Sequence, residues 1–444
     1  MMSRFPIFWK LSLNPPQILT LGFIAVIIVG TFLLTLPIST SEPIGVIDAL
    51  FTATSATTVT GLVVLDTGTE FTLFGQIVIM ILIQLGGLGL MTFAIMIVLI
   101  LGKKIGLRER ILVQESFNQS TLGGLVRLVK SLLIFTFSME IIATVLLSIR
   151  WVPEYGFGIG IFTSLFHVVS AFNNAGFSLW SDSLMGYVGD PVVNIIITFL
   201  FIVGGIGFTV ISDLMRTRKY HQLSLHTKLM IIGTLSINII ATIVIFLLEY
   251  TNSETLANLA LDEKLWASYF QAVTPRTAGF NSLDIGSMNP ATLTLTMFLM
   301  FIGAGSASTG SGIKLTTFIV IVLAVNAYLR GKKEAVIFKR SIPGQVVHRA
   351  LAITVISLLM VITVIFLLTI TEDAPYLHII FEAFSAFGTV GLSMGLTAEL
   401  SESGKLLLCI LMLAGRIGPI TLAFALARTS KGNIGYPKDD VFTG

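Results

Sequence analysis

Four stretches of the sequence share one pattern, in which an aromatic residue precedes a glycine by ten positions and Leu or Phe follows that glycine. They read FTATSATTVTGL at 51–62, FHVVSAFNNAGF at 166–177, YFQAVTPRTAGF at 269–280 and FEAFSAFGTVGL at 381–392. Glycine adopts φ > 0 without steric cost, so each stretch can turn sharply and aim several carbonyl oxygens at one point. Rings of carbonyl oxygens can replace the hydration shell of a cation. One copy would be an ordinary loop, but four copies in register favour a common site.

A second candidate segment, GAGSASTGSGIKLTT at 303–317, lies within an uncharged run from 289 to 327. As one helix this run would be ~58 Å long, against a hydrocarbon core of ~30 Å, so the helix must break. The segment is not a phosphate-binding P-loop, because Gly312 is followed by Ile313 and because no strand precedes it. We predict an unwound loop in a cavity below the turns; a simple kink is the alternative.

The elements that position these residues are long apolar segments. The chain is 54% hydrophobic and 11% charged, whereas soluble proteins carry about 25% charged residues. An apolar span precedes each turn, at 17–38, 126–149, 228–248 and 350–370, and another follows it, at 72–101, 191–212, 291–328 and 406–427. The helix before each turn has about ten residues, or ~15 Å, which is too short to cross the membrane. The chain must therefore enter the membrane through this helix and return to the same side.

We therefore predict an all-α integral membrane protein with eight transmembrane helices. Four repeated units, each a span, a re-entrant pore loop and a span, surround a pseudo-fourfold pore. The predicted units are 1–125, 126–227, 228–345 (with the unwound loop) and 346–444. Clusters of small residues recur in the second spans, as GGLG at 86–89, GGIG at 204–207, GAGS at 303–306 and GRIG at 415–418. We interpret the first two as sites of close helix packing.

Most lysines and arginines fall in the segments after the second spans and in the two termini. By the positive-inside rule, both termini are cytoplasmic and the turns open to the outside. The basic segment 102–119 is predicted to be an interfacial or cytoplasmic helix that contacts anionic lipid or a partner. Cys409 is the only cysteine, so no disulfide forms within the chain.

Five charged residues fall at membrane depth. Arg276 precedes the third glycine by three positions, and we expect it to brace the turn through carbonyls or through an acid such as Glu382. Glu140 should be paired or lie on a polar helix face. Lys314 either extends to the cytoplasm or closes the loop by hydrogen bonds. Arg416 should reach the cavity below the turns and bond loop carbonyls near Gly305–Gly310.

The four turns, one per unit, resemble those of the Trk/Ktr/HKT superfamily of potassium transporters, and the short cytoplasmic segments resemble the membrane subunit of a bacterial Ktr system. The resemblance covers nearly the whole chain. It implies a multi-pass protein of the bacterial cytoplasmic membrane, a homodimer, and a cytoplasmic ring of nucleotide-binding regulatory subunits. It implies no cofactor on this chain and no nucleic-acid partner; potassium is the substrate, and membrane lipid surrounds the protein.

The resemblance also assigns residues. The implied selectivity filter consists of Thr58, Val59, Thr60, Gly61, Asn174, Ala175, Gly176, Thr277, Ala278, Gly279, Thr389, Val390 and Gly391. The implied intramembrane gate consists of Gly303, Gly305, Ser306, Ser308, Thr309, Gly310, Gly312 and Lys314, with Arg416 as the residue expected to act on it.

Other function classes fit less well. A secondary transporter that couples potassium to sodium or proton entry would be built from two inverted halves with an acid at the membrane centre, whereas the repeats here are four and parallel. An enzyme would need a nucleophile and base or a metal-ligand cluster, and the five histidines show no ligand spacing. We expect no enzymatic activity and no metal site other than potassium at the filter.

Overall fold

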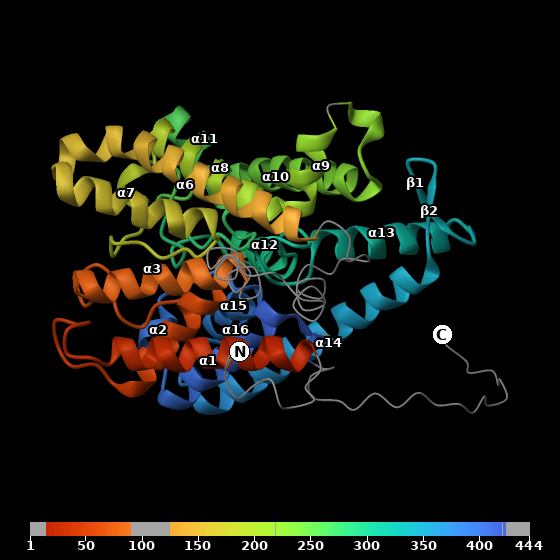
Figure 1. Ribbon diagram of the computed structural model, residues 1–444. Coiled ribbons are helices and arrows are strands. Elements are labelled where there is room, and N and C mark those ends of the chain that lie inside the picture. The colour runs from red at the N-terminus through yellow and green to blue at the C-terminus, as the bar shows by residue number, and fades with distance from the viewer. Residues whose placement is uncertain (1–14, 90–124, 218, 420, 423–444) are drawn as a thin grey trace, which may run out of the picture.

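The computed structural model describes residues 15–89, 125–217, 219–419 and 421–422, and nearly all of their regular structure is helical. Each of four successive repeats contains a long helix, a short helix and a second helix (Figure 1). The predicted helix at 102–119 lies outside the described residues.

The first repeat consists of α1 (Pro15–Leu34), α2 (Val46–Thr58) and α3 (Leu73–Leu88), and the second of α6 (Leu125–Tyr155), α7 (Phe157–Phe172), α8 (Pro191–Ile206) and α9 (Phe208–Arg216). The third repeat consists of α10 (Leu225–Glu249), α11 (Leu261–Val273), α12 (Pro290–Phe301) and α13 (Leu315–Leu329). Strands β1 (Ala335–Ile337) and β2 (Arg340–Ile342) follow, and the fourth repeat consists of α14 (Gly344–Thr371), α15 (Tyr376–Gly388) and α16 (Glu402–Ile417). Short 3-10 turns lie at Met185–Tyr187, Tyr220–Gln222 and Leu396–Glu399.

The helix that opens each repeat is long and apolar enough to cross a membrane. These are α1, α6, α10 and α14, and the bent pair of α8 and α9 would make a fifth span. The second helices α3, α8, α12 and α16 have only 12 to 16 residues, fewer than the ~20 that a straight span needs. The apolar span predicted at 191–212 contains a bend that was not predicted, because α8 and α9 meet at an angle of 93°.

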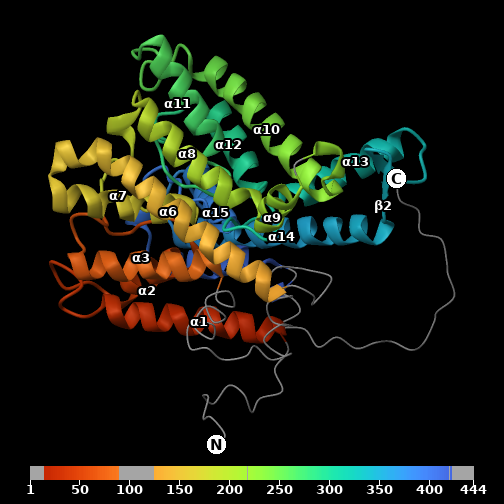
Figure 2. The ribbon, with the colours of Figure 1, turned by 45° about the horizontal axis from the view of Figure 1, so that its top comes forward.

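The short helices before the turns have 13 or 16 residues, more than the ten predicted but still too short to span. The broken helix of the third repeat is confirmed, because α12 ends at Phe301 and α13 begins at Leu315. The hairpin of β1 and β2 was not predicted. It projects beside the ends of α13 and α14 (Figures 1 and 2), and its turn residues Phe338 and Lys339 have positive φ.

The apolar core is shared between neighbouring repeats. Separate clusters join repeats one and two, two and three, three and four, and four and one; their members include Ala56 and Phe166, Phe172 and Phe270, Met300 and Phe381, and Phe51 and Phe387, respectively. The repeats therefore pack as a closed ring in chain order. The second halves of α2 and α15 are almost wholly buried at its centre.

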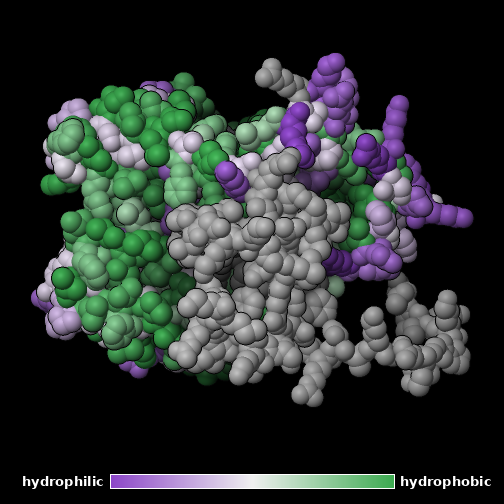
Figure 3. All heavy atoms as spheres, in the orientation of Figure 1, coloured by the Kyte–Doolittle hydropathy of each residue, from purple (hydrophilic) through white to green (hydrophobic). Residues whose placement is uncertain are grey.

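The outer surface is mostly apolar. Large exposed side chains include Ile28 and Phe32 on α1, Ile141 on α6 and Ile240 on α10, as a lipid-facing surface requires. Hydrophilic residues gather mainly at the end of the molecule where the hairpin projects (Figure 3). Exposed basic residues there include Arg330, Lys332, Lys333, Lys339 and Arg340.

Candidate functional site

The four turns share one backbone conformation. In each, a residue other than glycine has positive φ two positions before the glycine: Val59 (54°), Asn174 (59°), Thr277 (72°) and Thr389 (46°). The glycines that follow have φ between 71° and 92°. A β-branched residue rarely adopts positive φ, and such strain persists only where the surroundings impose it. The repetition at three β-branched positions therefore points to a function that requires this backbone.

Hydrogen bonds from the preceding helix hold the strained backbone. The amide of Thr60 donates to the carbonyl of Ser55 at 2.8 Å, and the amide of Gly61 donates to the Ser55 hydroxyl at 3.1 Å. Ser385 makes the equivalent hydroxyl contact with Gly391 at 3.1 Å. In the second repeat the hydroxyl of Ser170 has no hydrogen-bond partner within the described part of the chain, and Val273 occupies the equivalent position in the third. The four turns thus share one backbone conformation but differ in the side-chain hydrogen bonds that hold it.

The turns meet in a ring that follows the order of the chain. The space that a side chain would occupy at Gly61 is filled by the carbonyl of Ala175 in the second turn, and that at Gly279 by the carbonyl of Val390 in the fourth. A Cβ on Gly176 would lie 2.9 Å from the carbonyl oxygen of Ala278, and one on Gly391 would overlap the carbonyl of Thr60. Each glycine therefore faces the carbonyl directly before the glycine of the next turn. Glycine is required here both by its positive φ and by the closeness of the neighbouring backbone.

The small-residue clusters pack against the backbone that leads into the turns. A side chain on Gly86 would overlap the carbonyl of Thr57, one on Gly204 that of Phe172, and one on Gly415 that of Phe387. These carbonyls lie four residues before the turn glycines, so the clusters allow close packing, as predicted for the first two of them. The last glycines of three clusters, Gly89, Gly207 and Gly418, also have positive φ and end their helices. This second role was not predicted from the sequence.

The unwound segment between α12 and α13, residues 302–314, lies against the second, third and fourth turns; we call it the gate loop. The hydroxyl of Thr309 donates to Asn174 Oδ1 at 2.8 Å. A side chain on Gly310 would overlap the Thr277 hydroxyl, and one on Gly312 would lie 3.6 Å from the Cα of Gly388. The gate loop therefore contacts residues at or next to the strained positions of three turns.

The bend between α8 and α9 supplies partners for the gate-loop backbone. The amides of Gly305 and Thr309 donate to the carbonyls of Gly205 (2.8 Å) and Gly204 (3.2 Å), and the amide of Phe208 donates to the carbonyl of Ala307 at 2.7 Å. Irregular backbone at membrane depth is tolerated only where such partners exist. The bend thus explains how an unwound loop is stable at this depth.

Two basic side chains also hold the gate loop. Lys314 Nζ donates to the carbonyl of Gly310 at 2.8 Å, which selects loop closure over extension to the cytoplasm. Arg416 Nη1 donates to the carbonyl of Thr309, and its Nη2 donates to the carbonyls of Gly86 and Gly87 at the end of α3. The predicted contact with loop carbonyls is confirmed. A single guanidinium on α16 therefore connects the third repeat to the first.

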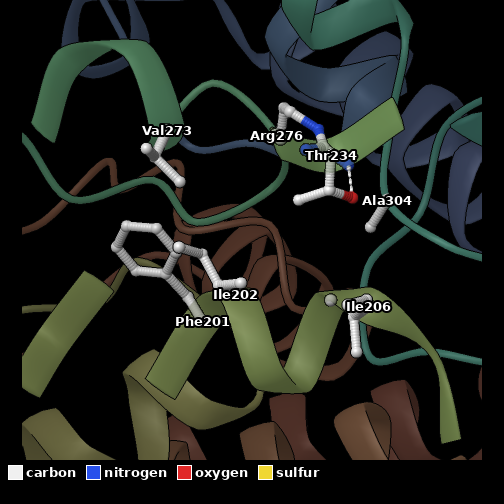
Figure 4. Close-up of a pocket in the computed structure, with 8 residues that line it drawn as sticks. Phe201, Ile202, Ile206, Thr234, Val273, Arg276 and Ala304 are labelled. Atoms are coloured by element: carbon white, nitrogen blue, oxygen red, sulfur yellow. Dashed lines mark hydrogen bonds between the residues drawn. The ribbon is translucent and has the colours of Figure 1, made fainter. Parts of the chain in front are cut away.

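The predicted partners of Arg276 are wrong. Its guanidinium donates to Asn238 Oδ1 (3.2 Å) and Thr234 Oγ1 (3.4 Å) on α10, not to turn carbonyls or Glu382. Figure 4 shows Arg276 and Thr234 on one side of a small cavity, with Phe201 and Ile202 opposite. The sequence cannot identify partners on α10, because they depend on how distant helices pack.

Two buried acids accept hydrogen bonds near the turns. Glu140 accepts from Gln84 Nε2 at 3.0 Å and from Asn173 Nδ2 at 3.4 Å, so the expectation of a paired residue is confirmed. Glu382 accepts from the hydroxyl of Thr397. The hydrogen bonds among Glu140, Gln84 and Asn173 connect the second turn to α3 and α6.

Comparisons with known proteins point to one family. A family model described as TrkH, cation transport protein, matches residues 12–434. The Ktr system potassium uptake protein B of Bacillus subtilis is 64% identical, over 97% of each chain. The protein of the same name from Vibrio alginolyticus is 47% identical, over 97% of this chain and 95% of its own length. The crystal structure of the potassium transporter TrkH from Vibrio parahaemolyticus has the same fold, with a TM-score of 0.76 at 21% identity, covering 96% of this chain and 87% of that one.

Proposed function

The chain belongs to the TrkH family of cation transport proteins, and we propose that it takes up potassium through the ring of four turns. The observation that carries this proposal is the cyclic contact between each turn glycine and the carbonyl of the next turn. Carbonyl oxygens converging on one axis are suited to a dehydrated monovalent cation. The names of the two relatives as potassium uptake proteins support the choice of ion.

In this proposal the selectivity filter consists of residues 58–61, 174–176, 277–279 and 389–391, with one glycine in each repeat. The four repeats act as four units around the pore, and the second helices complete eight spans. The gate loop lies below the filter and obstructs the path of the ion, and Arg416 holds it there. The contacts of Thr309 with Asn174 and Arg416 support this assignment.

We further propose a homodimer in the bacterial cytoplasmic membrane, with both termini cytoplasmic and the filter open to the outside. A cytoplasmic ring of nucleotide-binding subunits then controls the gate loop. The relatives' designation as part B of a Ktr system supports a separate partner. The exposed basic residues around the hairpin support a cytoplasmic position for that end.

The test is potassium uptake in a bacterial strain that lacks its own uptake systems, with and without the cytoplasmic partner. We expect the chain to restore growth at low potassium, with sodium competing poorly for uptake. No uptake above the empty-vector level would refute the function. Uptake that requires an inward sodium or proton gradient would instead identify a coupled secondary transporter.

A further inference from the structure

Asn174 differs from its counterparts in the other turns because its side chain joins three elements. It occupies the strained position of the second turn and is buried. Its Oδ1 accepts from Thr309 of the gate loop at 2.8 Å, and its Nδ2 donates to the hydroxyl of Thr277 in the third turn at 3.3 Å. At the equivalent positions, Val59 has no polar side-chain atom, and the Thr389 hydroxyl has no partner among the described residues. The gate loop therefore bonds to the second turn in a way it cannot bond to the first.

We propose that Thr309 is a positioning residue for the filter, so that the ion preference of the ring depends on the position of the gate loop. This inference rests on the proposed function and concerns the regulation of the same site. It goes beyond a purely steric gate, which would change how much ion passes without changing which ion passes.

A change in the position of Asn174 would directly affect the ring of turn carbonyls. The next residue, Ala175, presents its carbonyl to Gly61 of the first turn. When the gate loop moves away, Asn174 Oδ1 is left buried without its donor, which is unfavourable. The backbone of Asn174 is strained and kept in place by its surroundings. Loss of the Thr309 bond therefore loosens the residue that aims the Ala175 carbonyl.

The contacts of Thr309 allow the hydroxyl to be tested alone. Its amide donates to Gly204, its carbonyl accepts from Arg416, and only its hydroxyl reaches Asn174. Thr309→Val has nearly the same shape and leaves both backbone contacts in place. Thr309→Ser keeps the hydroxyl and is the conservative variant.

The measurement is the potassium-to-sodium preference from competition uptake by purified, monodisperse protein in lipid vesicles. One neutral hydrogen bond corresponds to about a fivefold change in an equilibrium, so we expect Thr309→Val to lower the preference about fivefold and Thr309→Ser to keep it. Thr316→Val is the matched control, because the Thr316 hydroxyl bonds to Ser306 and not to a turn. It should keep the wild-type preference.

A double-mutant cycle tests whether the effect passes through Asn174. Glycine adopts the positive φ of this position without strain, so Asn174→Gly removes the acceptor while allowing the backbone conformation. In that background Thr309→Val should have no further effect on preference. Thr309→Ala repeats the test with a smaller side chain, should the valine variant not fold.

The inference would be overturned if folded Thr309→Val and Thr309→Ala kept the wild-type ion preference. It would also be overturned if Thr309→Val lowered the preference as much in the Asn174→Gly background as in the wild-type protein. The wild-type protein separates this failure from that of the proposed function. If it takes up potassium and these variants keep its preference, only the coupling is refuted. If it takes up no potassium, the proposed function fails first.

Discussion

Arg416 offers the sharpest test of the gate, because its side chain connects the gate loop directly to the end of α3. Its Nη1 bonds to the carbonyl of Thr309, and its Nη2 bonds to the carbonyls of Gly86 and Gly87. Arg416→Ala removes the bond on the loop side and leaves the amide of Thr309 bonded to Gly204. We therefore expect higher maximal uptake and, because an open gate loop no longer bonds to Asn174, a lower potassium-to-sodium preference.

The size of the effect follows from the number of bonds lost. The bond to Thr309 is assisted by the guanidinium charge, and such bonds contribute about 1.5–3 kcal/mol. The second contact with the loop, to Ser311 Oγ at 3.4 Å, is long and adds little. Each 1.4 kcal/mol is a factor of ten, so the ratio of open to closed protein should rise about tenfold to a hundredfold. Measured flux rises by less once most molecules are open.

The assay is rubidium or potassium flux into vesicles, divided by the amount of purified, monodisperse protein. Arg416→Lys separates two causes: lysine keeps the positive charge below the filter but cannot fork between the loop and α3. High flux in both variants assigns the effect to the loop contact, whereas high flux only in the alanine variant assigns it to repulsion of the ion. Wild-type flux per molecule in Arg416→Ala, with a lower yield of folded protein, would refute the gating role and leave a structural one.

Three further predictions concern the filter and its surroundings. Replacing any turn glycine by serine should lower the potassium-to-sodium preference in competition uptake, because the added Cβ is strained at positive φ and overlaps or crowds the next turn; wild-type preference in all four variants would rule out the filter assignment. Deleting 304–311 should raise flux and, by removing Thr309, also lower the preference; equal or lower uptake by the folded deletion variant would contradict the gate. Glu140→Ala should cost about 1–3 kcal/mol of stability by leaving the partly buried Gln84 side-chain amide without its acceptor. A thermal melt in detergent checks this, Glu154→Ala on the exposed end of α6 is the control, and equal melting temperatures would contradict it.

Features carried by local pattern were predictable from the sequence. The four turns, the break before Leu315 and the loop contact of Arg416 all follow from spacing, length and charge. The filter assignment remains a prediction. Positive φ at Val59 and Thr389 was not predictable, since β-branched residues locally disfavour that conformation. The partners of Arg276 and the bend at Gly207 were missed because both depend on packing between repeats.

Contacts between the first and fourth repeats bear on the order of events during synthesis. Lys405 Nζ lies 2.7 Å from Asp48 Oδ1 across 357 residues of chain, and Arg416 bonds to Gly86 across 330 residues. Until the ribosome has made this last repeat, the growing chain leaves one flank of the ring uncovered in the membrane. The gate loop, by contrast, is complete once the third repeat has been made. A newborn chain therefore contains the whole gate loop before the ring can close, and it gains the Arg416 contact that holds this loop only when the last repeat is made.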